Sequence, residues 1–282
     1  MINIKNILKT SLIFLFACNS QHEIKTFTFS DEKLMGKIET ITTVSYEAIE
    51  TGGTLVPGNK KGNSYRLEFI NDTILEQTIF DLSEEPTDKS RYIFNNKNSL
   101  LKRYIFCLKD EGQLSYEGIY DAHNNKIQEK IYNYGKELSM EAFFDYNSTN
   151  QIVKGIAQSY SHIPSGYWKY QHDKSGNVIS EDYFTKSENF LRNSNKKEYD
   201  SQDRLKKNIS FNNHRGETTT YFFRYDEKDN VIEKKTIHPN SITTETFSYK
   251  FDQKDNWVEK HIFLNGKPSE YVVRTIIYNE EI

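Results

Sequence analysis

The stretch FRYDEKDNVIEKK, Phe223 to Lys235, decides the fold because it recurs along the chain. YKFDQKDNWVEKH, Tyr249 to His261, is a near copy, and five further stretches follow the same plan around an Asp or Asn anchor. The anchors of the seven copies, spaced by 26 or 27 residues, are Asn95, Asp121, Asn147, Asp173, Asp200, Asp226 and Asp252. Such a fixed period indicates an array of similar supersecondary units.

Each unit predicts two β-strands joined by a tight turn. Aromatic residues alternate before the anchor, as in Tyr221, Phe223 and Tyr225, and strand formers such as Val231 follow it. The residue three positions after each anchor is Gly, Asn or Asp, the types that tolerate a positive φ. We therefore expect a type I turn with a left-handed fourth residue. The predicted structural turn residues are Asp121, Asp173, Gly176, Asp200, Asp226, Asp229, Asp252 and Asp255.

The predicted fold is all-β. About seven β-hairpin repeats of 26 residues form an antiparallel meander, which we expect to be a curved or spiralling sheet with an N-terminal capping β region. The expected division is a signal peptide at residues 1–17, the N-terminal β cap at 18–90 and the repeat array at 91–282. No linker separates cap and array, so one continuous body is predicted.

The N-terminus predicts a targeting segment. MINIKNILKTSLIFLFAC places Lys5 and Lys9 before an apolar stretch that is too short to span a bilayer. Its end resembles a bacterial lipobox, which implies cleavage before Cys18 and a lipid on that residue. The next residue is Asn19 rather than Asp, which favours the outer membrane of a Gram-negative bacterium. The alternative is an ordinary signal peptide with an incidental cysteine.

The repeat also resembles a known family. Tyr-x-Tyr/Phe-Asp-x-x-Gly/Asp is similar to the YD repeat of RHS-type proteins, and YQHDKSGNVI (170–179) and EYDSQDRL (198–205) carry the pattern best. The resemblance covers about residues 90–279 and implies hairpins in a long spiralling sheet. Lipobox and short array together resemble YD/RHS-like repeat lipoproteins of Bacteroidetes-type bacteria. This implies a fold and an address in the cell envelope, but no activity.

Composition and motifs predict little chemistry. A net charge of −3 gives no reason to expect a nucleic-acid partner. Apart from Cys18 the only cysteine is Cys107, so neither a disulfide framework nor a cysteine metal pair is predicted. Calcium could use the acidic turns, but Lys228 and Lys254 lie inside two of them, and a structural turn is the favoured interpretation. No catalytic residue, metal or cofactor is predicted.

Three functions remain open from the sequence. The first is a lipid-anchored, non-catalytic scaffold or binding protein with a protein or glycan partner, whose candidate ligand contacts are Tyr167 and Trp168. The second is a glycan-processing or other hydrolytic enzyme that uses carboxylates on the concave sheet face. The third is an accessory or immunity-like protein of a toxin system, which only the repeat resemblance suggests. We expect the first, and therefore no enzyme.

Overall fold

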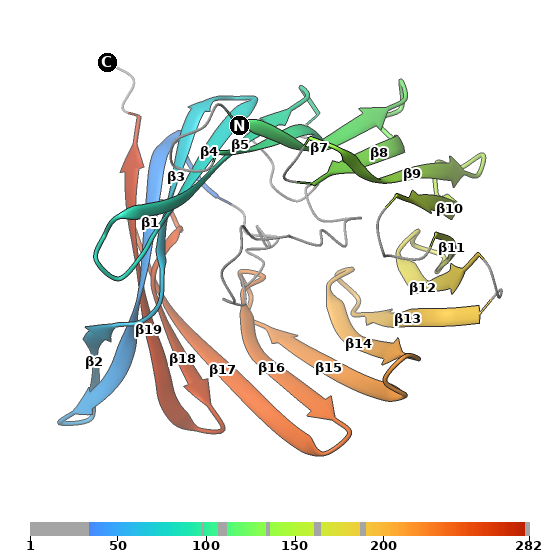
Figure 1. Ribbon diagram of the computed structural model, residues 1–282. Coiled ribbons are helices and arrows are strands. Elements are labelled where there is room, and N and C mark those ends of the chain that lie inside the picture. The colour runs from blue at the N-terminus through green and yellow to red at the C-terminus, as the bar shows by residue number, and fades with distance from the viewer. Residues whose placement is uncertain are drawn as a thin grey trace.

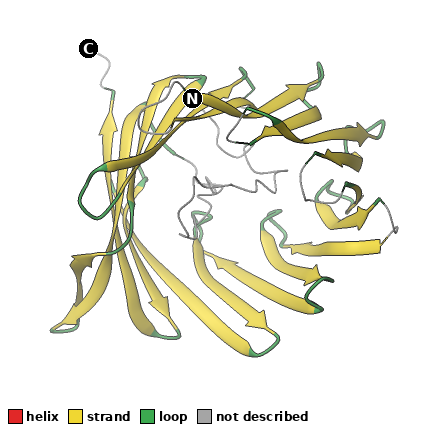
Figure 2. Ribbon diagram, in the orientation of Figure 1, coloured by secondary structure: helices red, strands yellow, loops and turns green. Residues whose placement is uncertain are grey.

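The computed structural model describes residues 34–97, 99–106, 112–133, 136–160, 165–186 and 190–279. Strands and loops make up this part of the chain (Figure 2), because β-branched and aromatic residues alternate with polar ones between turns. The strands are β1 (Ile38–Thr51), β2 (Thr54–Lys60), β3 (Ser64–Asn71), β4 (Ile74–Phe80), β5 (Pro86–Phe94), β6 (Leu100–Phe106), β7 (Gln113–Tyr120), β8 (Lys126–Tyr132), β9 (Leu138–Tyr146), β10 (Ile152–Ser159), β11 (Gly166–His172), β12 (Val178–Thr185), β13 (Phe190–Tyr199), β14 (Leu205–Asn212), β15 (Glu217–Tyr225), β16 (Val231–His238), β17 (Ser241–Phe251), β18 (Trp257–Leu264) and β19 (Lys267–Tyr278).

The sheet is closed. From β3 to β19 each strand pairs antiparallel with the next, and β1 pairs both with β3 and with β19. The result is a barrel of 18 strands, in which the last strand lies beside the first (Figure 1). Strand β2 adds a hairpin to the end of β1, where Glu50 faces Leu55.

The predicted curved or spiralling sheet is therefore wrong, because the sheet closes into a barrel. Thr40 to Thr43 pair with Tyr65 to Glu68 on one side, and Ile38 to Glu47 pair with Glu270 to Tyr278 on the other. An open sheet leaves a row of unpaired N–H and C=O groups at each edge, and closure satisfies both rows. β1 is 14 residues long and pairs with both β3 and β19. The strands of the expected capping region are therefore part of the barrel wall.

The pairing register assigns every side chain to one of two faces, because side chains alternate along a strand. One face carries Ile41, Leu67 and Leu75, which are 1%, 5% and 1% exposed. The other carries Phe143 and Ile156, which are 45% and 40% exposed. Side chains converge on the concave side of a closed sheet and diverge on the convex side. The buried set is therefore the inner face and the exposed set the outer face.

Opposite walls of the barrel do not pack against each other in the described part of the chain. Strands in extensive contact are neighbours in the sheet. For 18 strands, a spacing of ~4.8 Å and a tilt of ~40° give a radius of roughly 18 Å, which side chains cannot bridge. Most of the buried hydrophobic residues accordingly form two clusters along neighbouring strands: Ile41, Leu67, Leu75, Phe94, Leu100 and Tyr116, and separately Ala142, Phe144, Ile152 and Ala157.

Candidate functional site

The turn between β15 and β16 contains the acidic pair singled out in the sequence. One carboxylate oxygen of Asp226, Oδ1, accepts the backbone N–H groups of Lys228 at 2.9 Å and Asn230 at 2.8 Å. The N–H of Asp229 donates to the carbonyl of Asp226 at 3.3 Å, and Asp229 has a φ of 67°. The first carboxylate thus organises the backbone, while the second residue supplies the left-handed conformation.

Other repeats have the same geometry. Asp121, Asp200 and Asp252 each accept the N–H groups two and four residues further on, and Asp173 accepts that of Asn177. The residues at the fourth position with positive φ are Asn124 (68°), Asn150 (58°), Gly176 (88°), Asp203 (59°), Asp229 (67°) and Asp255 (62°).

These hydrogen bonds affect the ionisation of the turn carboxyls. Burial alone would raise the pKa of Asp200, but the N–H groups of Arg204 and Gln202 and the Arg204 guanidinium outweigh it, so the pKa is lowered. The N–H of Asn177 likewise lowers the pKa of Asp173. Asp173 and Asp200 are therefore held as anions, which suits backbone capping and not the donation of a proton.

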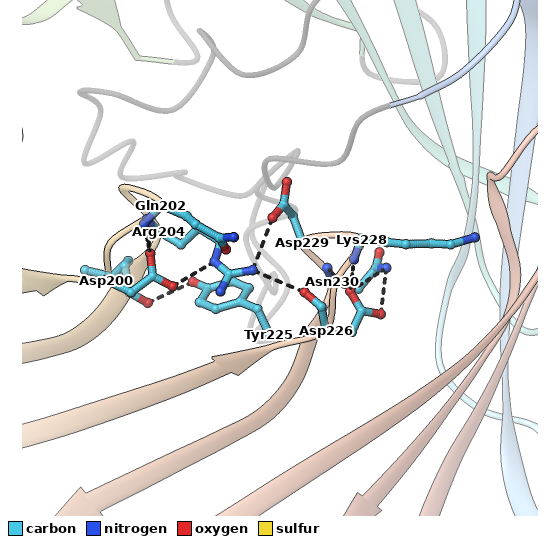
Figure 3. Close-up of polar contacts among 9 residues, drawn as sticks. Asp200, Gln202, Arg204, Tyr225, Asp226, Lys228, Asp229 and Asn230 are labelled. Atoms are coloured by element: carbon cyan, nitrogen blue, oxygen red, sulfur yellow. Dashed lines mark hydrogen bonds and ion pairs between the residues drawn. The ribbon is translucent and has the colours of Figure 1, made fainter.

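Neighbouring turns also contact one another along one rim of the barrel. Arg204 binds Asp200 in its own turn through Nε at 2.8 Å (Figure 3). Its NH1 then reaches the next turn, at 3.1 Å from the Asp226 carbonyl and 3.2 Å from Asp229 Oδ1. Further turn-to-turn bonds join Asn95 to Asn124, Asn125 to Asn150, Asn177 to Asp203 and Lys228 to Asp255. Among the described residues no group of three His, Cys, Asp or Glu side chains could hold a metal ion.

The two predicted ligand contacts lie on opposite faces of β11. Trp168 is on the inner face, with ring centroids 6.3 Å from Phe144 and 4.9 Å from Tyr183. Tyr167 is on the outer face and stacks on Phe184 at 5.1 Å with an interplanar angle of 12°. Only Tyr167 therefore belongs to a surface on the outside of the barrel, and Trp168 packs in the second hydrophobic cluster.

Tyr167 is part of a row that crosses four strands. The register aligns Phe143 of β9, Ile156 of β10, Tyr167 of β11 and Phe184 of β12, and we call this row the outer apolar stripe. The parallel row beside it holds Asp145, Lys154, Lys169 and Asp182. The Nζ of Lys169 lies 5.7 Å from the Tyr167 ring and 5.1 Å from the Phe184 ring, within range of cation–π attraction.

The rest of the outer face is strongly charged. Ion pairs across strands include Glu76 with Lys89 and Arg91, and Lys250 with Glu259. Charged residues that the register places on this face are Arg66, Glu68, Glu76, Lys89, Arg91, Lys102, Glu117, Lys130, Glu141, Lys196, Lys207, Arg224, Glu233, Lys235, Lys250 and Glu259. Apolar residues such as Phe106, Phe222 and Ile242 also lie on this face, and the outer apolar stripe is the row in which they are continuous over β9 to β12.

Sequence reasoning missed Phe143, Ile156 and Phe184 as surface residues. The available signal was that β9 to β12 carry apolar residues on both alternating faces, so one set must lie outside. Cys18, Cys107 and residues 161–164 lie outside the described residues. The lipid anchor therefore stays a prediction.

Comparisons with known proteins complete the description. No protein-family model and no curated protein matches the sequence. A porin-like protein from Bacteroides uniformis shares 10% identity, with 86% of this chain and 98% of that chain covered and a TM-score of 0.42. A porin-like protein from Bacteroides vulgatus shares 11% identity, with 87% and 100% covered and a TM-score of 0.30.

A third likeness is to the Tc holotoxin pore of Photorhabdus luminescens. It has 11% identity and a TM-score of 0.35 over 77% of this chain and 14% of that one. TM-scores below 0.5 carry no argument about function. Separately, the described part of the chain has no helix that is long and apolar enough to cross a membrane.

Proposed function

We propose that this protein is a lipid-anchored, non-catalytic cell-envelope protein that binds a glycan through the outer apolar stripe. The observation that carries the proposal is the continuous apolar row on the outer face, in which Phe143 and Ile156 are exposed and Tyr167 and Phe184 are half-buried. Contiguous exposed apolar surface with a polar rim marks an interaction site. Four strands spaced ~4.8 Å apart give the row a width of roughly 14 Å, enough for a short oligosaccharide.

The neighbouring residues favour a glycan over a purely apolar partner. Sugar rings present apolar C–H faces to aromatic side chains and hydroxyl groups to polar ones. The row of Asp145, Lys154, Lys169 and Asp182 provides carboxylate acceptors and ammonium donors directly beside the aromatic residues. Charges of both signs suit neutral hydroxyl groups, which both donate and accept hydrogen bonds.

The charged outer face supports a barrel that stands outside the bilayer. A barrel that spans a membrane needs an outward apolar band, and one Lys or Arg at the bilayer midplane costs about 2–4 kcal/mol. Ion pairs such as Arg224 with Glu233 and Lys250 with Glu259 occupy this face instead. Attachment would then depend on the lipid predicted at Cys18, as acyl chains provide stable anchoring when two or more are present.

The carboxyl groups support the non-catalytic interpretation over a glycosidase. A glycosidase needs one carboxyl group with a raised pKa as general acid. In the described residues, the carboxyls whose pKa departs from the ordinary value are all lowered: Glu76, Asp121, Asp173, Asp200, Asp252 and Glu259. For Glu76, burial opposes this shift, but hydrogen bonds from Lys89 and Arg91 outweigh it. The accessory role in a toxin system rests on the repeat resemblance alone and stays a prediction.

Glycan-array binding of the mature chain with Cys18→Ala tests the function. Tyr167→Ala should weaken binding at least tenfold, because it removes the centre of the row. Tyr104→Ala is the matched control, since Tyr104 is an outer-face tyrosine of β6 away from the stripe, and should bind normally. No glycan binding by the parent chain, or equal binding by Tyr167→Ala, would contradict the proposal.

Membrane fractionation tests the anchor. The parent chain should sediment with membranes, and Cys18→Ala should release it into the soluble fraction. If Cys18→Ala sediments as before, the barrel or another segment holds the protein to the membrane, and the lipid-anchor proposal is wrong.

A further inference from the structure

The inner face of β6 holds a buried arginine, Arg103, that pairs with no carboxylate in the described part of the chain. Arg103 is 9% exposed, and its NH2 donates to the Ser90 hydroxyl at 3.3 Å. Its Nε has no hydrogen-bond partner among the residues that the structure describes. None of the ion pairs among the described residues includes Arg103.

Such an arrangement is costly for the protein alone. A guanidinium stays protonated, and a buried charge without a counter-ion is destabilising. The chain avoids this cost at another buried cation, since Lys126 lies 2.5 Å from Glu129. Asp88 of β5 also lies on the inner face. Tyr92 is the residue opposite Arg103, and Asp88 precedes Tyr92 by four positions, or roughly 13 Å along the strand. That carboxylate is too far away to neutralise Arg103.

A second buried donor lies on a neighbouring part of the same face. Gln77 of β4 is 5% exposed, and no described residue accepts a hydrogen bond from its Nε2. Its Oε1 accepts the hydroxyl of Tyr92 at 3.0 Å, so the donor side of this amide is the unused side. The ring of Tyr92 lies 5.4 Å from the Arg103 guanidinium carbon, so the same side chain contacts both donors.

We propose that Arg103 and Gln77 form an anion-binding site on the inner wall of the barrel and that its ligand carries a carboxylate. The unused groups are N–H donors, which an anion satisfies and a cation does not. The Nε–H and a terminal N–H of a guanidinium match the two oxygens of a planar carboxylate. The site is on the opposite face from the outer apolar stripe, so it is independent of the glycan proposal.

Thermal unfolding of the full mature chain in sodium D-glucuronate tests the site. Ionic strength is held constant with sodium chloride, and D-glucose serves as the neutral control. The melting temperature should rise with glucuronate in a saturable way and stay constant with glucose, because a ligand that binds the folded state stabilises it. No saturable rise in the parent chain overturns the proposal.

Three variants separate binding from a structural role. Arg103→Met should abolish the response to glucuronate and unfold, in glucuronate-free buffer, at the parent temperature or above, because it removes an uncompensated buried charge. Arg224→Met, at an exposed outer-face arginine, should retain the full response. A response that persists in Arg103→Met, or a lower melting temperature of that variant in glucuronate-free buffer, overturns the site.

The third variant guards against a failure of Arg103→Met to fold. Arg103→Lys keeps the positive charge but loses the two parallel N–H donors of the guanidinium. It should raise the half-saturating glucuronate concentration at least tenfold. Inorganic phosphate at the same ionic strength tests the class of anion. A tighter response to phosphate than to glucuronate would overturn the carboxylate assignment.

Discussion

Asn256 offers the sharpest test of how the barrel closes. It is 2% exposed and follows the anchor turn between β17 and β18. Its Nδ2 donates to the Met35 carbonyl at 2.8 Å and to the Tyr278 hydroxyl at 2.7 Å, and its Oδ1 accepts the Met35 N–H at 2.8 Å. One amide therefore joins the turn to both ends of the described chain.

Replacing Asn256 with Ala should lower the free energy of unfolding by about 3 kcal/mol. It removes three hydrogen bonds of ~1 kcal/mol each, and the two backbone groups of Met35 lose a buried partner. The matched control is Asn230→Ala in the preceding repeat, where the amide binds only Asp226 of its own turn. That variant should lose about 1 kcal/mol.

Urea unfolding followed by tryptophan fluorescence measures both variants. The difference between them, about 2 kcal/mol, exceeds the usual extrapolation error when the slopes agree. Differences within ~0.5 kcal/mol are neutral for a surface change. If the free energies of unfolding of the two variants agree within ~0.5 kcal/mol, Asn256 does not hold together the two ends of the barrel, and the expectation is refuted.

Three further outcomes are expected. Asp229→Val should lose about 1–2 kcal/mol in urea unfolding, because a β-branched residue resists the φ of 67°, whereas Asp229→Gly should be close to neutral. Trp168→Ala should lose about 3 kcal/mol and Tyr167→Ala about 1 kcal/mol, since only the former packs in the inner cluster; equal losses would contradict the assignment of faces. Stability should fall with pH below the ordinary values of 3.8 for Asp and 4.5 for Glu, because the pKa of Asp252 and that of Glu76 are lowered in the folded state. The ionised forms of both carboxyls stabilise the fold above those values, and this contribution disappears as the pH falls through the folded pKa. Glu76→Gln should make the free energy of unfolding less dependent on pH. An unchanged urea midpoint of the parent chain between pH 5 and pH 3 would contradict this prediction.

The hairpins could be predicted from the sequence because their signal is local. Asp226 and Asp229 stand three residues apart, and one turn needs a side-chain acceptor at its first position and a left-handed residue at its fourth. Closure is not local. A period specifies how each hairpin pairs with the next, but whether Val44 meets Val273 depends on curvature summed over all the strands.

The candidate surface was partly within reach of the sequence. Tyr167 and Trp168 are adjacent in the chain, and period-two alternation is sufficient to separate them onto two faces. Which face is concave could not be predicted, because an open sheet can curve either way until its ends are joined. The buried pair Arg103 and Gln77 gave no sequence signal, since an arginine in a strand is ordinarily a solvated residue.

The double pairing of β1 has a consequence for the order of folding. Tyr46 pairs with Tyr271, so the seam joins positions 225 residues apart, and closing such a loop costs about 5 kcal/mol of chain entropy. Each hairpin can form as soon as its own residues are available, whereas the seam cannot form until β19 exists. Until then β1 and the newest strand are both exposed edges that can pair with other chains. A nascent or truncated chain that lacks residues 267–279 should therefore be aggregation-prone even though nearly all of its hairpins are intact.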